Sequence, residues 1–221
     1  MHKGAPESCQ STPACPQGGT CPHMAELETL RNELETLRAL VHTDALTGLF
    51  NYRHFTQALD LEMERARRSG KPVALLMLDL DHFKSFNDTW GHEFGNKTLQ
   101  HVARLIQNTV RRLDIPCRYG GEEFAVILPD TMLHAAIVLA ERLREIIAQT
   151  PLYCDETLLH VQASIGVDML AAGDRDDVES FVRRTDAWLL RAKATGRNRV
   201  CHPAERVATH VSTDERDLLL G

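Results

Sequence analysis

Residues 118–124 constrain the fold of this chain more than any other stretch of its sequence. Two glycines, Gly120 and Gly121, are followed by two glutamates and by an apolar run that extends to Leu128. A Gly-Gly pair between two strand-like segments is typical of a tight hairpin turn, and glycine lets a large ligand approach the backbone because it has no Cβ. The segment therefore predicts a hairpin whose turn carries carboxylates suited to a hard cation such as Mg²⁺. A solvent-exposed acidic turn is the alternative.

A second acidic cluster follows a predicted buried strand upstream. Residues 73–78 form a continuous apolar run, which is typical of a strand covered on both faces. Asp79 and Asp81 come next, on one face of the strand, because strand side chains alternate with a period of two. Carboxylates at a strand end hold the metal in many Mg²⁺-dependent phosphoryl-transfer sites, and Lys84 adds a compact charge suited to a phosphate. A strand end with solvated acids would have the same pattern.

Together these motifs resemble those of the GGDEF-domain diguanylate cyclases. The resemblance extends over residues 42–202. It rests on motifs in a fixed order, at residues 44–49 (DALTGL), 79–84 (DLDHFK), 87–88 (ND), 91–92 (GH), 120–124 (GGEEF), 163–167 (ASIGV) and 192–198 (AKATGRN). It implies an α+β fold with a βαββαβ core, like the palm of polymerases and class III nucleotide cyclases. It also implies an enzyme in which two facing domains, each holding one GTP, form cyclic di-GMP and release pyrophosphate.

The resemblance also implies the residues of the reaction centre. Asp79, the backbone carbonyl of Leu80, and Glu122 would hold Mg²⁺ or Mn²⁺, with two cations per active site. Glu122 would also accept the proton of the 3′-hydroxyl group, and Glu123 would support the metal site. Lys84 would stabilise the charge that develops on the phosphates.

The implied substrate contacts include one departure from the family pattern. The base contacts are Phe83, Asn87, His92 and Asn96, and the phosphate contacts are Lys193 and Arg197, for which a solvated basic helix end is the alternative. Where the family has an aspartate that accepts from two guanine N–H groups, this chain has Asn96, whose amide has one carbonyl acceptor. Loss of such a charge-assisted bond costs about 1.5–3 kcal/mol. Guanine affinity is therefore in question, and a mixed GMP-AMP product is an alternative.

A regulatory motif precedes the Gly-Gly turn. Arg111 and Asp114 form an Arg-x-x-Asp pattern at the spacing of the family's inhibitory product site. By resemblance Arg111 would bind a phosphate or a guanine edge, Asp114 would accept from a guanine N–H, and Arg142 would correspond to an arginine that a partner domain supplies. Cyclic di-GMP is therefore expected as both product and inhibitor. A catalytically weak domain that acts as a cyclic di-GMP receptor is the alternative function.

The first 23 residues are rich in proline and glycine and cannot form a core on their own. Cys9, Cys15 and Cys21 are spaced evenly there, and His23 follows them. Three thiolates and an imidazole are a possible tetrahedral Zn²⁺ or redox site, although the spacing is not that of a zinc knuckle. A disordered cysteine-bearing tail is the alternative.

An internal repeat follows the cysteine-bearing segment. Its apolar residues are spaced alternately three and four apart, which is the seam of a coiled coil: Leu27, Leu30, Leu34, Leu37 and Val41. In a parallel dimer, Glu33 of one chain would face Arg38 of the other. The repeat therefore predicts a homodimer, with an intramolecular amphipathic helix as the alternative.

The expected organisation is a tail over 1–23, a coiled-coil helix over 24–42, the cyclase domain over 43–203 and a second tail over 204–221. Within the domain we expect helices over 55–68, 99–113, 136–147 and 178–194, and strands over 73–78, 115–119, 124–128 and 161–168. The formal charge of −6 gives no nucleic-acid footprint. The apolar runs are shorter than the ~20 residues of a membrane span. We therefore expect a cytoplasmic protein with no nucleic-acid partner.

Overall fold

The computed structural model describes residues 22–40, 42–154, 157–171 and 173–204. Helix α1 (Pro22–Leu40) and the domain that starts at His42 are two separate units. In α1 the seam residues Leu27, Leu30, Leu34 and Leu37 are all exposed. The helix preceding the domain is therefore confirmed, while its pairing with a second copy stays a prediction.

Most residues of the predicted zinc or redox site lie outside the part of the chain that the structure describes. Cys9, Cys15 and Cys21 lie outside the described residues, and His23 belongs to the first turn of α1. Among the helices that the structure describes, none combines the length and the apolar character that crossing a bilayer would need.

The domain is built on a five-stranded sheet with the strand order β2-β3-β1-β6-β7. Its strands are β1 (Val73–Leu80), β2 (Ile115–Arg118), β3 (Glu123–Pro129), β6 (Ala163–Leu170) and β7 (Val200–Cys201). The central strand β1 is antiparallel to both β3 and β6, whereas β7 runs parallel to β6. A separate two-stranded hairpin consists of β4 (Leu152–Cys154) and β5 (Thr157–Leu159). The predicted α+β class with a βαββαβ core is confirmed.

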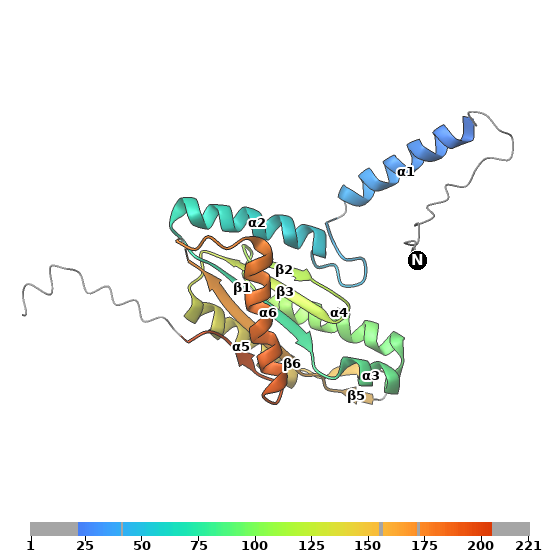
Figure 1. The fold of residues 1–221 in the computed structure, drawn as a ribbon. Helices are drawn as coiled ribbons and strands as arrows, with labels where there is room; N and C mark the ends of the chain where they lie inside the picture. The colour runs from blue at the N-terminus through green and yellow to red at the C-terminus, as the bar shows by residue number, and fades with distance from the viewer. Residues whose placement is uncertain (1–21, 41, 155–156, 172, 205–221) are drawn as a thin grey trace, which may run out of the picture. The chain divides into compact units, whose positions relative to one another are not determined.

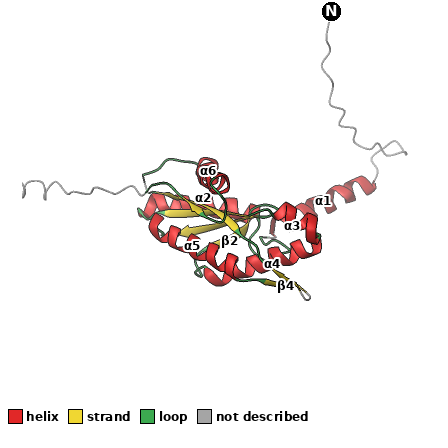
Figure 2. Cartoon of the chain, turned by 90° about the horizontal axis from the view of Figure 1, so that it is seen from below, coloured by secondary structure: helices red, strands yellow, loops and turns green. Residues whose placement is uncertain are grey.

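Helices cover both faces of the sheet (Figures 1 and 2). The helices of the domain are α2 (Tyr52–Ser69), α3 (Phe83–Trp90), α4 (His92–Thr109), α5 (Leu133–Gln149) and α6 (Val178–Ala194). One core lies between the sheet and α4 and α5, and it takes Leu76 and Leu78 from β1. The other lies under α2 and α6, and it takes Leu75 and Met77. Because both faces of β1 are buried, its sequence is apolar at every position up to Leu78.

The main error of the sequence-based assignment is the end of the second predicted helix. Helix α4 ends at Thr109, and Leu113 is 78% exposed instead of continuing the apolar face. The physical reason is a local hydrogen bond, because the Asp114 carboxylate accepts from the backbone N–H of Arg111 at 2.8 Å and closes a turn. Strand β6 is also displaced by two residues from the expected 161–168.

Helix α6 lies unusually close to the sheet at Gly166 of β6. A Cβ atom on Gly166 would lie 2.3 Å from the backbone N of Leu189 and 2.5 Å from the backbone O of Thr185. The strand and the helix backbone can approach this closely only because Gly166 has no side chain.

We expect Gly166→Ala to destabilise the domain by about 1–3 kcal/mol, because the new methyl group meets helix backbone that cannot move aside freely. The measurement is urea unfolding of the variant beside Gly173→Ala, a change at a glycine with no heavy atom within 4 Å of the added Cβ. Equal stability of the two variants would contradict the close contact.

Candidate active site

The predicted hairpin places the Gly-Gly turn at the end of β1. Strands β2 and β3 pair antiparallel, with Arg118 opposite Phe124, and residues 119–122 connect the two strands. Asp79 of β1 lies opposite Glu123 of β3, and the backbone N–H of Leu80 donates to the carbonyl of Glu122 at 3.4 Å. The two acidic motifs of the sequence therefore meet at one edge of the sheet.

Asp79 is the most buried carboxylate of this edge, and it forms an ion pair with Lys193 of α6. The Lys193 Nζ atom lies 2.8 Å from Asp79 Oδ2, and only 8% of the Asp79 side chain is exposed. Burial raises the pKa of Asp79, Lys193 opposes this rise, and Asp81 adds to it. Lys193, predicted as a phosphate contact, is thus bonded to the predicted metal ligand.

The two glycines of the turn have different surroundings. A Cβ on Gly120 would lie 2.5 Å from Glu123 Oε2, so the space beside Gly120 is taken by the chain's own carboxylate. Gly121 has no heavy atom within 4 Å of its Cβ position, which leaves that side of the turn accessible. The expectation that glycine leaves room for a ligand therefore holds at Gly121 only.

Glu122 and Glu123 are half-buried, and burial raises the pKa of each. The charge of Asp79 raises both further, whereas Lys193 lowers them. A carboxylate whose pKa lies above its ordinary value is a better proton acceptor near neutral pH. The arrangement suits Glu122 to that predicted role.

Arg118 fixes the turn, and the sequence-based reasoning missed this. Its Nε donates to the carbonyl of Gly120 at 3.1 Å and its Nη2 to the carbonyl of Gly121 at 2.7 Å. Its Nη1 lies 3.1 Å from Asp44 Oδ1, in the segment that enters the domain. Asp44 also accepts from the backbone N–H of Thr47 at 2.9 Å. Asp44 and Arg118 are too far apart in the sequence for any motif spacing to predict their contact.

Asp81 binds protein groups rather than facing the turn. Its Oδ1 accepts from Ser164 Oγ at 2.7 Å and its Oδ2 from the backbone N–H of Asn198 at 2.8 Å. Arg197 and Asn198 have positive φ angles of 59° and 43°, which non-glycine residues rarely adopt. The Asp81 carboxylate therefore holds the loop that presents Arg197, and the charge of Arg197 acts on Asp79.

The predicted base contacts lie on α3 and α4. Asn87 Oδ1 is buried and has no hydrogen-bond partner among the described residues, although a Cβ on Gly95 would lie only 1.9 Å from it. Phe83 is buried behind them, whereas His92 and Asn96 are exposed. A buried acceptor without a donor is costly, so Asn87 is suited to receive a donor from a ligand. Lys84, at the start of α3, is exposed as well.

The Arg-x-x-Asp residues form a partly buried cluster away from the turn. Arg111 Nη2 lies 3.2 Å from Asp114 Oδ1 and 2.8 Å from Thr131 Oγ1. The Arg111 side chain is 63% exposed, whereas that of Asp114 is fully buried. Asp114 therefore orients Arg111, which is the group that faces solvent. Arg142 donates to the carbonyl of Thr109 at 2.8 Å.

Within the described residues, no three His, Cys, Asp or Glu side chains gather into a metal-binding cluster. The donor chemistry nevertheless fits a hard cation. Asp79 offers a buried carboxylate that already faces one positive charge, and Glu122 offers a second whose pKa is raised by burial and by the charge of Asp79. Oxygen ligands of this kind are those that Mg²⁺ prefers.

Comparison with known proteins agrees with this geometry. Residues 41–199 match the family model described as "Diguanylate cyclase, GGDEF domain". The chain is 44% identical over 173 residues to the response regulator PleD of Caulobacter vibrioides, covering 77% of this chain and 38% of PleD. It is 36% identical over 167 residues to a diguanylate cyclase of Vibrio cholerae, covering 76% of this chain and 51% of that protein. The chain thus spans no more than about half the length of these relatives.

Solved structures give the same result. The coiled coil and GGDEF domain of DgcB from Caulobacter crescentus, solved in complex with c-di-GMP, superposes with a TM-score of 0.71 at 34% identity. That alignment covers 82% of this chain and 95% of the DgcB chain. The active GGEEF domain of a diguanylate cyclase from Vibrio cholerae superposes with a TM-score of 0.66 at 34% identity, covering 70% of this chain and 97% of that one. This chain belongs to the GGDEF family of diguanylate cyclase domains.

Proposed function

We propose that this chain is a diguanylate cyclase that condenses two GTP molecules into cyclic di-GMP. The observation that carries the proposal is the buried Asp79 carboxylate, which lies against Lys193 where the Gly-Gly turn meets β1. Glu122 stands beside it as a second carboxylate with a raised pKa. The names of the relatives in Vibrio cholerae and Pseudomonas aeruginosa support the reaction class.

Asp79, the carbonyl of Leu80, and Glu122 would hold the divalent cations, Mg²⁺ or Mn²⁺, two per site. Such cations, when bound, neutralise phosphate oxygens and make the attacking hydroxyl more acidic. Glu122 would accept the proton of the 3′-hydroxyl, and Glu123 would keep the site negative. In each condensation the 3′ oxygen of one nucleotide bonds to the α-phosphorus of the other, and pyrophosphate leaves.

The chain's cationic and amide groups would bind the nucleotide. Lys84, Lys193 and Arg197 would hold the phosphates, since all three belong to segments that converge on the end of β1. Asn87, with its unpartnered buried oxygen, would accept from the base. Asn96, next to Gly95 on α4, is the position at which discrimination between guanine and adenine would be set.

The reaction requires two domains, because each holds one nucleotide. Helix α1 presents a stripe of leucines that are 46–61% exposed, which suits them to pair with a second copy in a coiled coil. The structural relative from DgcB includes a coiled coil before its GGDEF domain. We therefore include a homodimer through α1 in the proposal.

Incubation with GTP, ATP and Mg²⁺ should give cyclic di-GMP, identified by mass together with any mixed GMP-AMP product that Asn96 permits. Asp79→Asn should lower turnover by at least about 100-fold, because the variant loses one charge of the cation site. Asp130→Asn, at an exposed carboxylate paired with Lys71, is the matched control and should keep full activity. Absence of every cyclic dinucleotide from the wild-type reaction would overturn the proposed reaction.

We also propose that cyclic di-GMP inhibits the enzyme by binding the exposed guanidinium of Arg111, which Asp114 orients. Arginine binds phosphates and guanine edges with two parallel hydrogen bonds. The partial exposure of Arg111 beside a fully buried carboxylate suits such a contact. Arg142, bonded to Thr109 near the start of the motif, would serve a facing domain.

Arg111→Ala should raise the concentration of cyclic di-GMP that halves the rate by at least about tenfold, since a charge-assisted contact is lost. The initial rate should stay unchanged, because Arg111 lies outside the reaction centre. Arg112→Ala changes the exposed neighbour of Arg111 within the motif. Cyclic di-GMP should inhibit this control variant as strongly as it inhibits wild type. Binding of cyclic di-GMP without any turnover would instead favour the receptor function.

A further inference from the structure

Helix α6 is attached to the sheet at three points along its length. Near its C-terminal end Lys193 pairs with Asp79 of β1, and in its middle the helix backbone lies against Gly166 of β6. Towards its N-terminal end Arg184 pairs with Asp168 of β6. The first attachment belongs to the candidate active site, whereas Arg184 lies nine residues before Lys193, in the N-terminal half of the helix.

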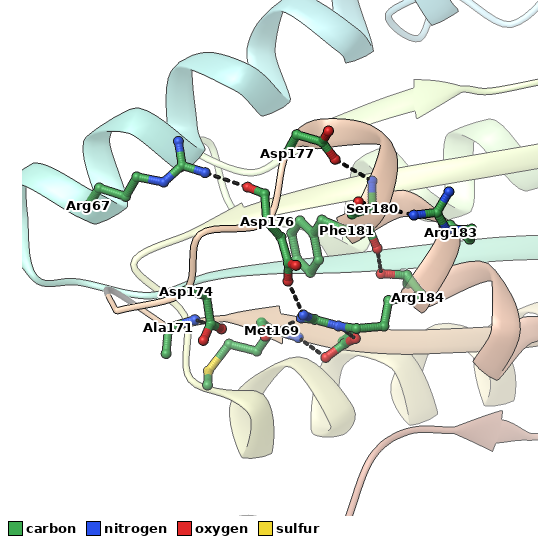
Figure 3. Close-up of polar contacts among 12 residues, drawn as sticks. Arg67, Met169, Ala171, Asp174, Asp176, Asp177, Ser180, Phe181, Arg183 and Arg184 are labelled. Atoms are coloured by element: carbon green, nitrogen blue, oxygen red, sulfur yellow. Dashed lines mark hydrogen bonds and ion pairs between the residues drawn. The ribbon is translucent and has the colours of Figure 1, made fainter.

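Arg184, whose side chain is 39% exposed, makes several bonds to groups around a buried carboxylate (Figure 3). Arg184 Nε lies 2.6 Å from Asp168 Oδ2, and Nη2 donates to the carbonyl of Met169 at 3.1 Å. Only 6% of the Asp168 side chain is exposed, and its other oxygen accepts from the backbone N–H of Met169 at 2.7 Å. Two of the three guanidinium nitrogens are thus bonded to groups of β6.

The same contact extends to α2. Arg184 Nη1 pairs with Asp176 in the loop between β6 and α6, and the carbonyl of Asp176 accepts from Arg67 Nη2 at 2.5 Å. Asp177, the next residue, caps α6 by accepting from the backbone N–H of Ser180 at 2.8 Å. Figure 3 shows Arg67 and Arg184 reaching Asp176 from α2 and α6. The start of α6 is therefore fixed to a strand on one side and to a helix on the other.

The three attachments lie in a row on one face of the sheet. Asp168 and Gly166 are two residues apart on β6, and Ser164, two residues further, is the partner of Asp79 in β1. Arg184 and Lys193 are nine residues apart, which is about 13.5 Å along the helix axis at a rise of 1.5 Å per residue. Because a helix of this length is stiff, a shift at Arg184 displaces Lys193 and the loop that carries Arg197.

We infer that Arg184 is a positioning residue of the proposed cyclase site. It keeps α6 in place on β6 while Lys193 exchanges its contact with Asp79 for one with the triphosphate. The inference rests on the proposed function, in which Asp79 binds a cation and Lys193 is released to the triphosphate. The attachment of Lys193 to Asp79 is then lost. Arg184 takes no part in that exchange, so its bonds to Asp168 and Met169 keep Lys193 and Arg197 beside the substrate.

Steady-state kinetics with GTP separates positioning from chemistry. Arg184→Met should raise KM by about tenfold and leave kcat within about twofold, because triphosphate contacts made in both ground and transition states are weakened. Arg183→Met is the matched control, since Arg183 is 70% exposed and, within the part of the chain that the structure describes, bonds Glu179 and Ser180 of its own helix. Arg184→Lys should recover part of the loss because it keeps the charge.

Hydrogen–deuterium exchange of residues 188–194, measured without nucleotide, tests the inference independently of activity. Exchange there should be faster in Arg184→Met than in wild type and in Arg183→Met. If wild type forms no cyclic product, the proposed function fails, while this exchange still reports whether Arg184 holds the helix. Unchanged exchange together with an unchanged KM would overturn the inference.

Arg184→Met leaves the buried Asp168 unpaired and could unfold the domain. The double variant Asp168→Asn with Arg184→Met removes both charges and keeps a carbonyl acceptor for the Met169 N–H. It should fold and should show the same rise in KM and the same faster exchange. A folded double variant with wild-type KM and exchange would equally overturn the inference.

Discussion

The ion pair between Asp79 and Lys193 is the interaction on which the rest of the site depends. It joins the central strand β1 to the end of α6, at the edge of the sheet where the Gly-Gly turn also lies. A carboxylate this deeply buried needs a positive partner, because an uncompensated charge in the interior is strongly unfavourable. The protein supplies that partner from Lys193. A divalent cation offers the same compensation with a larger charge, so the geometry that stabilises the protein without ligands also defines the place where the proposed cations bind.

Two further sets of contacts hold the segments around this pair in place. Arg118 bonds both glycine carbonyls of the turn and the Asp44 carboxylate, so the segment that enters the domain and the acidic turn form one unit. Burial by itself would raise the pKa of Asp44, but the hydrogen bonds from Thr47 and Arg118 lower it, which keeps the carboxylate charged at neutral pH. Asp81 in turn holds the loop after α6, because its carboxylate accepts from the backbone N–H of Asn198.

Patterns with a local physical cause could be read from the sequence. The continuous apolar run of β1 follows from burial on both faces, and the Gly-Gly hairpin follows from turn geometry. The contacts that complete the site could not be predicted in this way. Arg118 with Asp44, Lys193 with Asp79 and Arg184 with Asp168 all join segments that only the fold brings together. The helix expected over 99–113 was wrong at its end, because the apolar spacing continues into the turn that Asp114 closes.

The central claim is that Lys193 occupies the place of a cation at Asp79. It is tested by using electron paramagnetic resonance to measure Mn²⁺ binding in the absence of nucleotide. Lys193→Met should bind Mn²⁺ more tightly than wild type by about tenfold, because the competing ammonium is gone. The same variant should bind GTP more weakly, since a phosphate contact is lost, and Asp79→Asn should bind Mn²⁺ more weakly. Unchanged or weaker Mn²⁺ binding by a folded Lys193→Met variant would contradict the account.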